Sequence, residues 1–229
     1  MVKSIGRLIA VLGLFAIGFA TGPAQAETDG QQRVVERARL ALDSFLDDPN
    51  FHQMGVYVQN AYAVLIVPEL IKGGFFVGAQ YGIGVLMVRD PQTGAWGKPA
   101  FYDLYGGSFG LQIGGASTDV VFTIMNEGAV DRLLAHGVKL GADLGVAAGR
   151  MGAGVGAATT THLGEDIYVF SKGKGLFGGF WLDGSWLRAK DDWNAAYYGR
   201  QVDAEQILRD RQVVASAEIT ALHESLTRF

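Results

Sequence analysis

Cysteine does not occur anywhere in the 229 residues. The chain therefore has no disulfide, no thiolate metal ligand, no thiol nucleophile and no cysteine that carries a lipid. Basic runs are missing too: 19 Lys and Arg stand against 23 Asp and Glu, which gives a formal charge of −4. Because a mildly acidic chain without a basic cluster offers nothing to a phosphate backbone, we expect no nucleic-acid partner.

The sequence also lacks an apolar run of the roughly 20 residues that a membrane-spanning helix needs. The apolar run 8–19 is shorter, follows Lys3 and Arg7, and precedes the small residues of Pro23-Ala24-Gln25-Ala26. This three-part pattern predicts a secretory signal peptide over residues 1–26, cleaved after Ala26. We therefore expect an exported bacterial protein that is periplasmic, peripheral to the outer membrane, or secreted. Residues 27–229 are enough for a single domain.

Glycine is scarce at both ends and dense in the middle, since 26 of the 33 glycines lie between Gly73 and Gly184. Each glycine inside a helix costs about 0.5–1 kcal/mol relative to alanine, whereas in a sheet it marks bulges and close backbone approaches. The distribution predicts helical ends around a β centre.

The ends carry helical periodicity. One apolar stripe predicts a first helix that ends at Asp47-Asp48-Pro49, and its members are Val34, Val35, Ala38, Ala41, Leu42, Phe45 and Leu46. A shorter helix is expected over 51–59. Two more are expected near the C-terminus, over 204–209 and along Ala215, Ile219, Leu222 and Leu226.

The centre contains short apolar runs that read as strands. They are 61–67, which stops at Pro68, 75–80, 83–88, 108–113, 119–125, 167–170 and 180–188. Several are apolar on both faces and so need cover on both sides. We predict an α+β fold with an antiparallel, barrel-like β centre flanked by N- and C-terminal helices. The Gly/Ala-rich stretch 137–161 fits either tightly packed small-residue strands or a loop.

Two motifs resemble catalytic ones without their context. Gly106-Gly107-Ser108-Phe109-Gly110 matches the G-x-S-x-G nucleophile elbow, but the residues after Ser108 alternate like a strand where the elbow needs a helix. Residues 152–157 match G-x-G-x-x-G/A, but three threonines follow in place of a helix, and no acidic residue stands about 20 positions later. The four histidines show no ligand spacing. We therefore expect no enzyme, no cofactor and no metal.

Aromatic residues stand beside lysines in two stretches. Lys72 precedes Gly-Gly-Phe75-Phe76, and Lys172 and Lys174 precede a second apolar group that contains Phe177, Phe180 and Trp181. Flexible glycines, aromatic side chains and nearby cations suit insertion at a bilayer interface, where each lysine gains about 1 kcal/mol from anionic headgroups. These eight residues are the predicted lipid-binding site. The alternative is that the aromatic side chains belong to the core, where phenylalanine is commonly buried.

An ordered series of short motifs resembles the SYLF domain family. It opens with Pro68-x-x-x-Lys72-Gly-Gly-Phe75-x-x-Gly78 and Gly82-x-Gly84, and passes through Trp96-x-x-Pro99-x-Phe101 and Gly107-Ser-x-Gly-x-Gln112-x-Gly114. It continues with Ser171-Lys-Gly-Lys-Gly-Leu-Phe177 and closes on Tyr197-Tyr198-Gly199. The resemblance covers about two thirds of residues 27–229. The segment Lys172-Gly173-Lys174 is more basic than the family's pattern.

The resemblance implies a non-catalytic phospholipid-binding domain, with a phospholipid or a membrane surface as its partner. Eukaryotic members bind phosphoinositides and some bind actin, but an exported bacterial protein would not meet actin, so actin is not expected here. Two alternatives stay open: an envelope structural or interaction module with no lipid ligand, and an integral outer-membrane barrel. The helical spacing before Phe229 disfavours the second, because such barrels need alternation in their strands.

Overall fold

A computed structural model describes residues 23–74, 77–109, 114–135, 137–148, 166–174, 182, 184–209 and 216–229. The helices of this part are α1 (Pro23–Leu46), η1 (Pro49–Phe51, a 3-10 turn), α2 (Met54–Asn60), α3 (Glu127–Ala135), α4 (Asp191–Tyr198), α5 (Ala204–Arg209) and α6 (Ala217–Thr227). The strands are β1 (Ala63–Gly74), β2 (Val77–Val88), β3 (Ala100–Phe109), β4 (Gly114–Ile124), β5 (Val138–Lys139), β6 (Val146–Ala148), β7 (Ile167–Lys174) and β8 (Trp186–Ala189).

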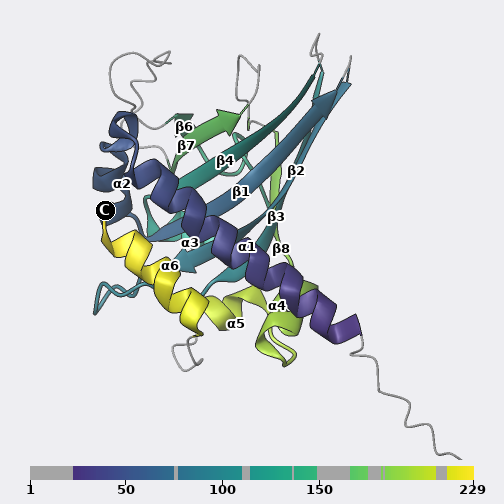
Figure 1. The fold of residues 1–229 in the computed structure, drawn as a ribbon. Coiled ribbons are helices and arrows are strands. Elements are labelled where there is room, and N and C mark those ends of the chain that lie inside the picture. The colour runs from purple at the N-terminus through teal and green to yellow at the C-terminus, as the bar shows by residue number, and fades with distance from the viewer. Residues whose placement is uncertain are drawn as a thin grey trace, which may run out of the picture.

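The strands form one curled sheet in the order β5-β8-β3-β2-β1-β4-β7-β6. Neighbouring strands are antiparallel except β6 and β7, which are parallel. Helix α1 crosses one face diagonally, beside α6 and α4 from the other end of the chain (Figure 1). The expected α+β fold, with a barrel-like antiparallel centre and helices from both termini, is confirmed as a half-barrel.

Strand β1 separates two apolar cores, which explains its two-sided apolar sequence. Val64 and Ile66 pack with Val35 and Leu42 of helix α1, on what we name the α1 face of the sheet. Leu65 and its alternate neighbours point to the opposite side, the inner face, which α3 and α5 cover. Because water is excluded from both faces, both sets of side chains gain from burial.

The prediction that the first strand stops at Pro68 was wrong. Strand β1 continues to Gly74 through a bulge, where its pairing with β4 shifts between Val67 and Leu70. Glu69 in the bulge has φ 54°, its N–H donates to Asp119 Oδ1 at 3.0 Å, and its carboxylate forms an ion pair with Arg37 of α1. A side-chain acceptor thus replaces the ladder partner that the bulge removes, which lets the strand pass a proline.

Other boundaries differ as well. Residues 100–107 belong to β3 although only its end was expected as a strand, and the helices α3 and α4 were not predicted. The expected helix over 51–59 is split into η1 and α2 by His52 and Gln53, while both C-terminal helices are confirmed. The expected strands over 75–80, 108–113 and 180–188 fall partly outside the described residues, as do most of the expected signal peptide and residues 149–161.

Candidate lipid-contact site

Two of the predicted lysines lie at one end of the sheet. Lys72 of β1 pairs with Ala116 of β4, and Lys174 of β7 pairs with Ser117, the next residue of β4. The described chain leaves β1 after Gly74 and β7 after Lys174 at this same end (Figure 1). The remaining predicted contacts follow these points and lie outside the described residues: Phe75, Phe76, Phe177, Phe180 and Trp181.

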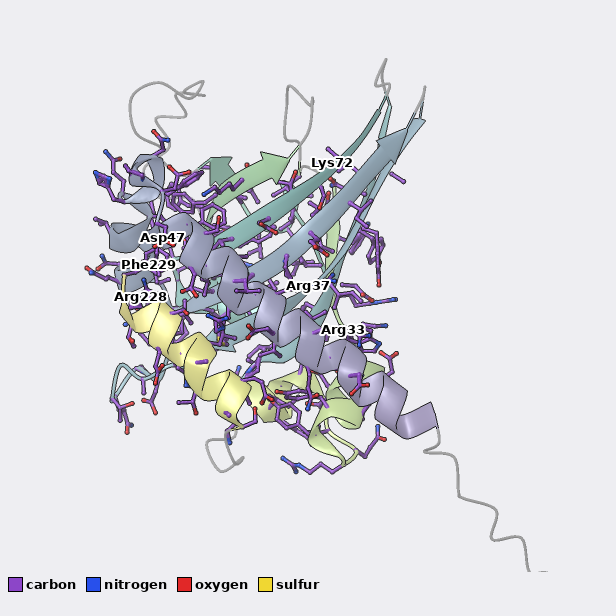
Figure 2. The ribbon with its side chains drawn as sticks, viewed as in Figure 1. Arg33, Arg37, Asp47, Lys72, Arg228 and Phe229 are labelled. Atoms are coloured by element: carbon purple, nitrogen blue, oxygen red, sulfur yellow. The ribbon has the colours of Figure 1, made fainter. Side chains whose placement is uncertain are left out.

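Lys72 is half-buried on the inner face, and burial lowers the pKa of its ammonium group to about 8. It pairs across the strands with Gln80, whose side-chain amide donates to Ser185 Oγ of the segment before β8. Figure 2 shows Lys72 toward the end of β1 that projects past helix α1. A lysine with this pKa is mostly charged at pH 7 and mostly uncharged at pH 9.

Lys172 is engaged inside the fold. Its Nζ donates to Ser44 O at 2.7 Å, lies 3.0 Å from Asp48 Oδ2 and stands 6.0 Å from the ring centre of Phe51. The hydrogen bond from Lys172 is the main reason that the pKa of Asp48 is lowered. This lysine therefore holds the end of α1 to strand β7, a role that its place in a basic sequence segment did not reveal.

The structure adds a group of residues that the sequence reasoning missed. Four side chains are cross-strand neighbours on β1, β2, β3 and β8: Ile71, Tyr81, Tyr105 and Trp186. We name them the aromatic row, because three of the four are aromatic. Ile71 is 63 % exposed, Tyr81 49 % and Trp186 40 %, while Tyr105 is half-buried. The row lies on the α1 face, because Leu70, Leu104 and Leu187, which neighbour its members in the sequence, belong to the core of the inner face. Strands β1 and β2 extend beyond helix α1 (Figure 1).

Cationic side chains border the aromatic row. The Arg188 guanidinium carbon lies 5.7 Å from the ring centre of Tyr105, and Lys139 of β5 pairs with Trp186. Arg33 and Arg37 follow the edge of α1 beside the uncovered part of the sheet (Figure 2), and Arg37 is paired there with Glu69. The surface thus joins exposed aromatic area to positive charge, the combination found where proteins meet a bilayer interface.

The acidic group nearest the row is buried and hydrogen-bonded within the fold. Asp103 is 7 % exposed, accepts a hydrogen bond from the Tyr81 hydroxyl at 2.9 Å and lies 4.0 Å from Lys190 Nζ. Burial, and then the bond to Asp103, raise the pKa of Tyr81 to about 12, so its phenol stays uncharged at physiological pH. Lys190 Nζ also lies 3.2 Å from Oδ2 of the exposed Asp192, so one ammonium group faces two carboxylates beside the row.

The described residues do not form the catalytic elbow that the sequence motif around Ser108 resembles. Ser108 of the G-x-S-x-G match lies within strand β3, so the strand-turn-helix of a nucleophile elbow does not form there. The described residues contain no cluster of three His, Asp or Glu side chains placed to hold a metal ion. None of the helices in this part combines the length and the apolar character needed to cross a bilayer.

Comparison with known proteins identifies relatives of the chain. Residues 105–229 match a family described as "Ysc84: Las17-binding protein actin regulator". The chain is 30% identical over 164 residues to the protein YSC84 of Saccharomyces cerevisiae, covering 70% of this chain and 35% of that protein. It is 32% identical over 168 residues to the SH3 domain-containing YSC84-like protein 1 of Xenopus laevis, covering 72% and 49%. The chain thus spans between a third and a half of the length of these relatives.

Proposed function

Because the chain belongs to the Ysc84 family of SYLF domains, we propose that it binds phospholipid at a membrane surface and catalyses no reaction. The observation that carries the proposal is the aromatic row, which joins Ile71, Tyr81 and Trp186 across the sheet. Transfer of large exposed apolar side chains from water into a bilayer interface lowers the free energy of the membrane-bound state. The bordering Arg and Lys side chains gain from anionic headgroups.

We also propose that the protein acts after export, at the envelope membrane. The support is the order of charged, apolar and small residues in 1–26. The family description refers to Las17 and actin, and one relative is named "LAS seventeen-binding protein 3", but an exported chain would meet a lipid surface before any cytoskeletal protein. The alternative is an envelope interaction module with no lipid ligand.

Sedimentation with vesicles tests the lipid proposal. We expect the chain from residue 27 onward to sediment with vesicles of phosphatidylcholine and phosphatidylglycerol, and more weakly with phosphatidylcholine alone. Salt should reduce the binding only in part, because screening weakens the lysine and arginine contacts and leaves the apolar contact in place. If the protein stays in the supernatant with every vesicle composition, the interaction module replaces the lipid-binding proposal.

The charge of Lys72 gives this binding a pH dependence. Raising the pH from 7 to 9 passes the pKa of about 8 and removes the charge, so we expect binding to phosphatidylglycerol vesicles to fall about fivefold, for one cation worth roughly 1 kcal/mol. Lys72→Arg keeps its charge over this range and should bind equally at both pH values. An equal fall in wild type and Lys72→Arg would assign the pH dependence to another group.

The same titration has a defined effect on stability. The folded pKa of Lys72, about 8, lies below its ordinary value of 10.5, so the unfolded chain binds more protons between these values. Lys72 should therefore make the free energy of unfolding rise as the pH increases from about 8 to about 10.5. In Lys72→Arg, this contribution to the dependence of unfolding free energy on pH should disappear. Urea unfolding at several pH values measures it.

A further inference from the structure

A cavity of about 520 Å³ lies at the other end of the sheet from Lys72. The loop between β2 and β3 forms one wall, and the helices α3, α5 and α6 form the others. This volume lies within the range of small-molecule pockets in proteins, roughly 300–1,000 Å³. None of the residues proposed above for membrane contact lines it.

Two cations in the lining, Lys98 and Arg89, are wholly or partly buried. Lys98 is 8 % exposed, and Arg89 is half-buried with its guanidinium carbon 4.3 Å from the ring centre of Trp96. Arg89 Nη2 donates to Val58 O at 2.8 Å, while its buried Nε has no hydrogen-bond partner among the described residues. Burial lowers the pKa of Arg89, but the pKa of a guanidinium is ordinarily so high that the group remains charged. A half-buried guanidinium with an unused donor favours an anionic ligand.

The acidic groups of the lining are occupied or exposed. Asp131 forms an ion pair with Arg209 at 2.8 Å, and Asp90 Oδ1 accepts the backbone N–H groups of Gln92 and Thr93. Glu127, at the start of α3, is exposed. The most deeply buried charged group of the lining is therefore a cation, Lys98, whereas its carboxylates are half-buried or exposed.

Apolar side chains complete the cavity beside the two cations. Trp96, Val130 and Leu208 are each less than 10 % exposed, and Val88 and Leu134 are half-buried. We infer that this cavity binds an amphipathic anion with a single short apolar tail, its carboxylate or phosphate head at Arg89 and Lys98 and its tail along Val130, Leu134 and Leu208. The inference is independent of the proposed membrane contact, which uses the other end of the sheet.

Binding of single-chain amphiphiles tests the inference. Laurate and dodecyl phosphate, each below its micelle concentration, are titrated into the protein by calorimetry, with dodecyltrimethylammonium as the cationic match. We expect saturable one-to-one binding of at least one anion and none of the cation. Arg89→Gln should weaken the binding at least tenfold, because it removes a charge-assisted hydrogen bond. The anion that binds more tightly identifies the head as a carboxylate or a phosphate.

Two further variants separate the cavity from folding and from the membrane site. Leu134→Trp fills the cavity while leaving both cations, and it should block the anion even if Arg89→Gln fails to fold. Arg209→Gln changes a cation at the rim that Asp131 already neutralises, and it should alter the affinity less than about threefold, the size of an exposed ion pair. Failure of both anions to bind, equal binding of the cation, or unchanged affinity in both Arg89→Gln and Leu134→Trp would overturn the inference, whatever the vesicle experiments show.

Discussion

The double variant Ile71→Ser/Trp186→Ser is expected to lose about thirtyfold in affinity for phosphatidylglycerol vesicles. Ile71 is 63 % and Trp186 40 % exposed in the free protein, and this exposed area is what a bilayer interface could newly bury. Partial burial of each stabilises the bound state by on the order of 1 kcal/mol, and two such contacts give this ratio. The variant leaves the hydrogen bond between Tyr81 and Asp103 in place, so the β2–β3 pairing should survive. Vesicle sedimentation at several lipid concentrations measures the affinity.

A matched control is available in the same chain. Leu40 and Val56 are 51 % and 62 % exposed, which is close to the row residues, but they lie on α1 and α2. Leu40→Ser/Val56→Ser removes comparable apolar area and should keep most of the vesicle binding. If both double variants lose the same affinity, exposed apolar area in general drives adsorption, and the aromatic row is not the contact. If neither loses affinity, the row has no part in binding.

The terminal helices and the two-sided strands could be predicted because their signals are local. The stripe of the first helix is buried as its spacing required, with Val35, Ala38, Leu42 and Phe45 almost completely enclosed. A strand that is apolar at every position needs two covered faces wherever it lies in the sheet. Such patterns depend only on residues within a few positions of each other, and the fold leaves them unchanged.

The aromatic row could not be predicted in the same way because it depends on pairing. Trp186 meets Tyr105 through the register of β8 on β3, across about 80 residues of sequence. One pair is local in the sequence, since the antiparallel register of β1 on β2 places Ile71 opposite Tyr81, only ten positions away. Lys172 shows the opposite error: its neighbours in the sequence suggested a basic loop, whereas its contacts come from Ser44 and Asp48, more than 120 positions away.

The largest expected loss of stability comes from adding one methyl group at Gly84. A Cβ atom there would lie 2.5 Å from Ile66 O and 2.7 Å from Val67 Cγ2, where β1 packs closely against β2 beside its bulge. The first contact is with backbone that is fixed between two strands, so rotation of a side chain gives no relief. Overpacking of this kind costs about 3 kcal/mol, and for a domain of this size Gly84→Ala should lower the melting temperature by about 6–12 °C.

Gly73→Ala provides the comparison, because a Cβ atom there meets nothing within 4 Å and the residue lies on the partner strand. Alanine reduces the freedom of the unfolded chain at either position, so Gly73→Ala should melt at or slightly above the wild-type temperature. Calorimetric melting of the two variants then compares one added methyl group in two surroundings. If both melt within about 2 °C of each other, β1 does not approach β2 as closely as the bulge at Glu69 requires. In that case the extension of β1 past Pro68, on which the position of Ile71 and the aromatic row depends, would have to be abandoned.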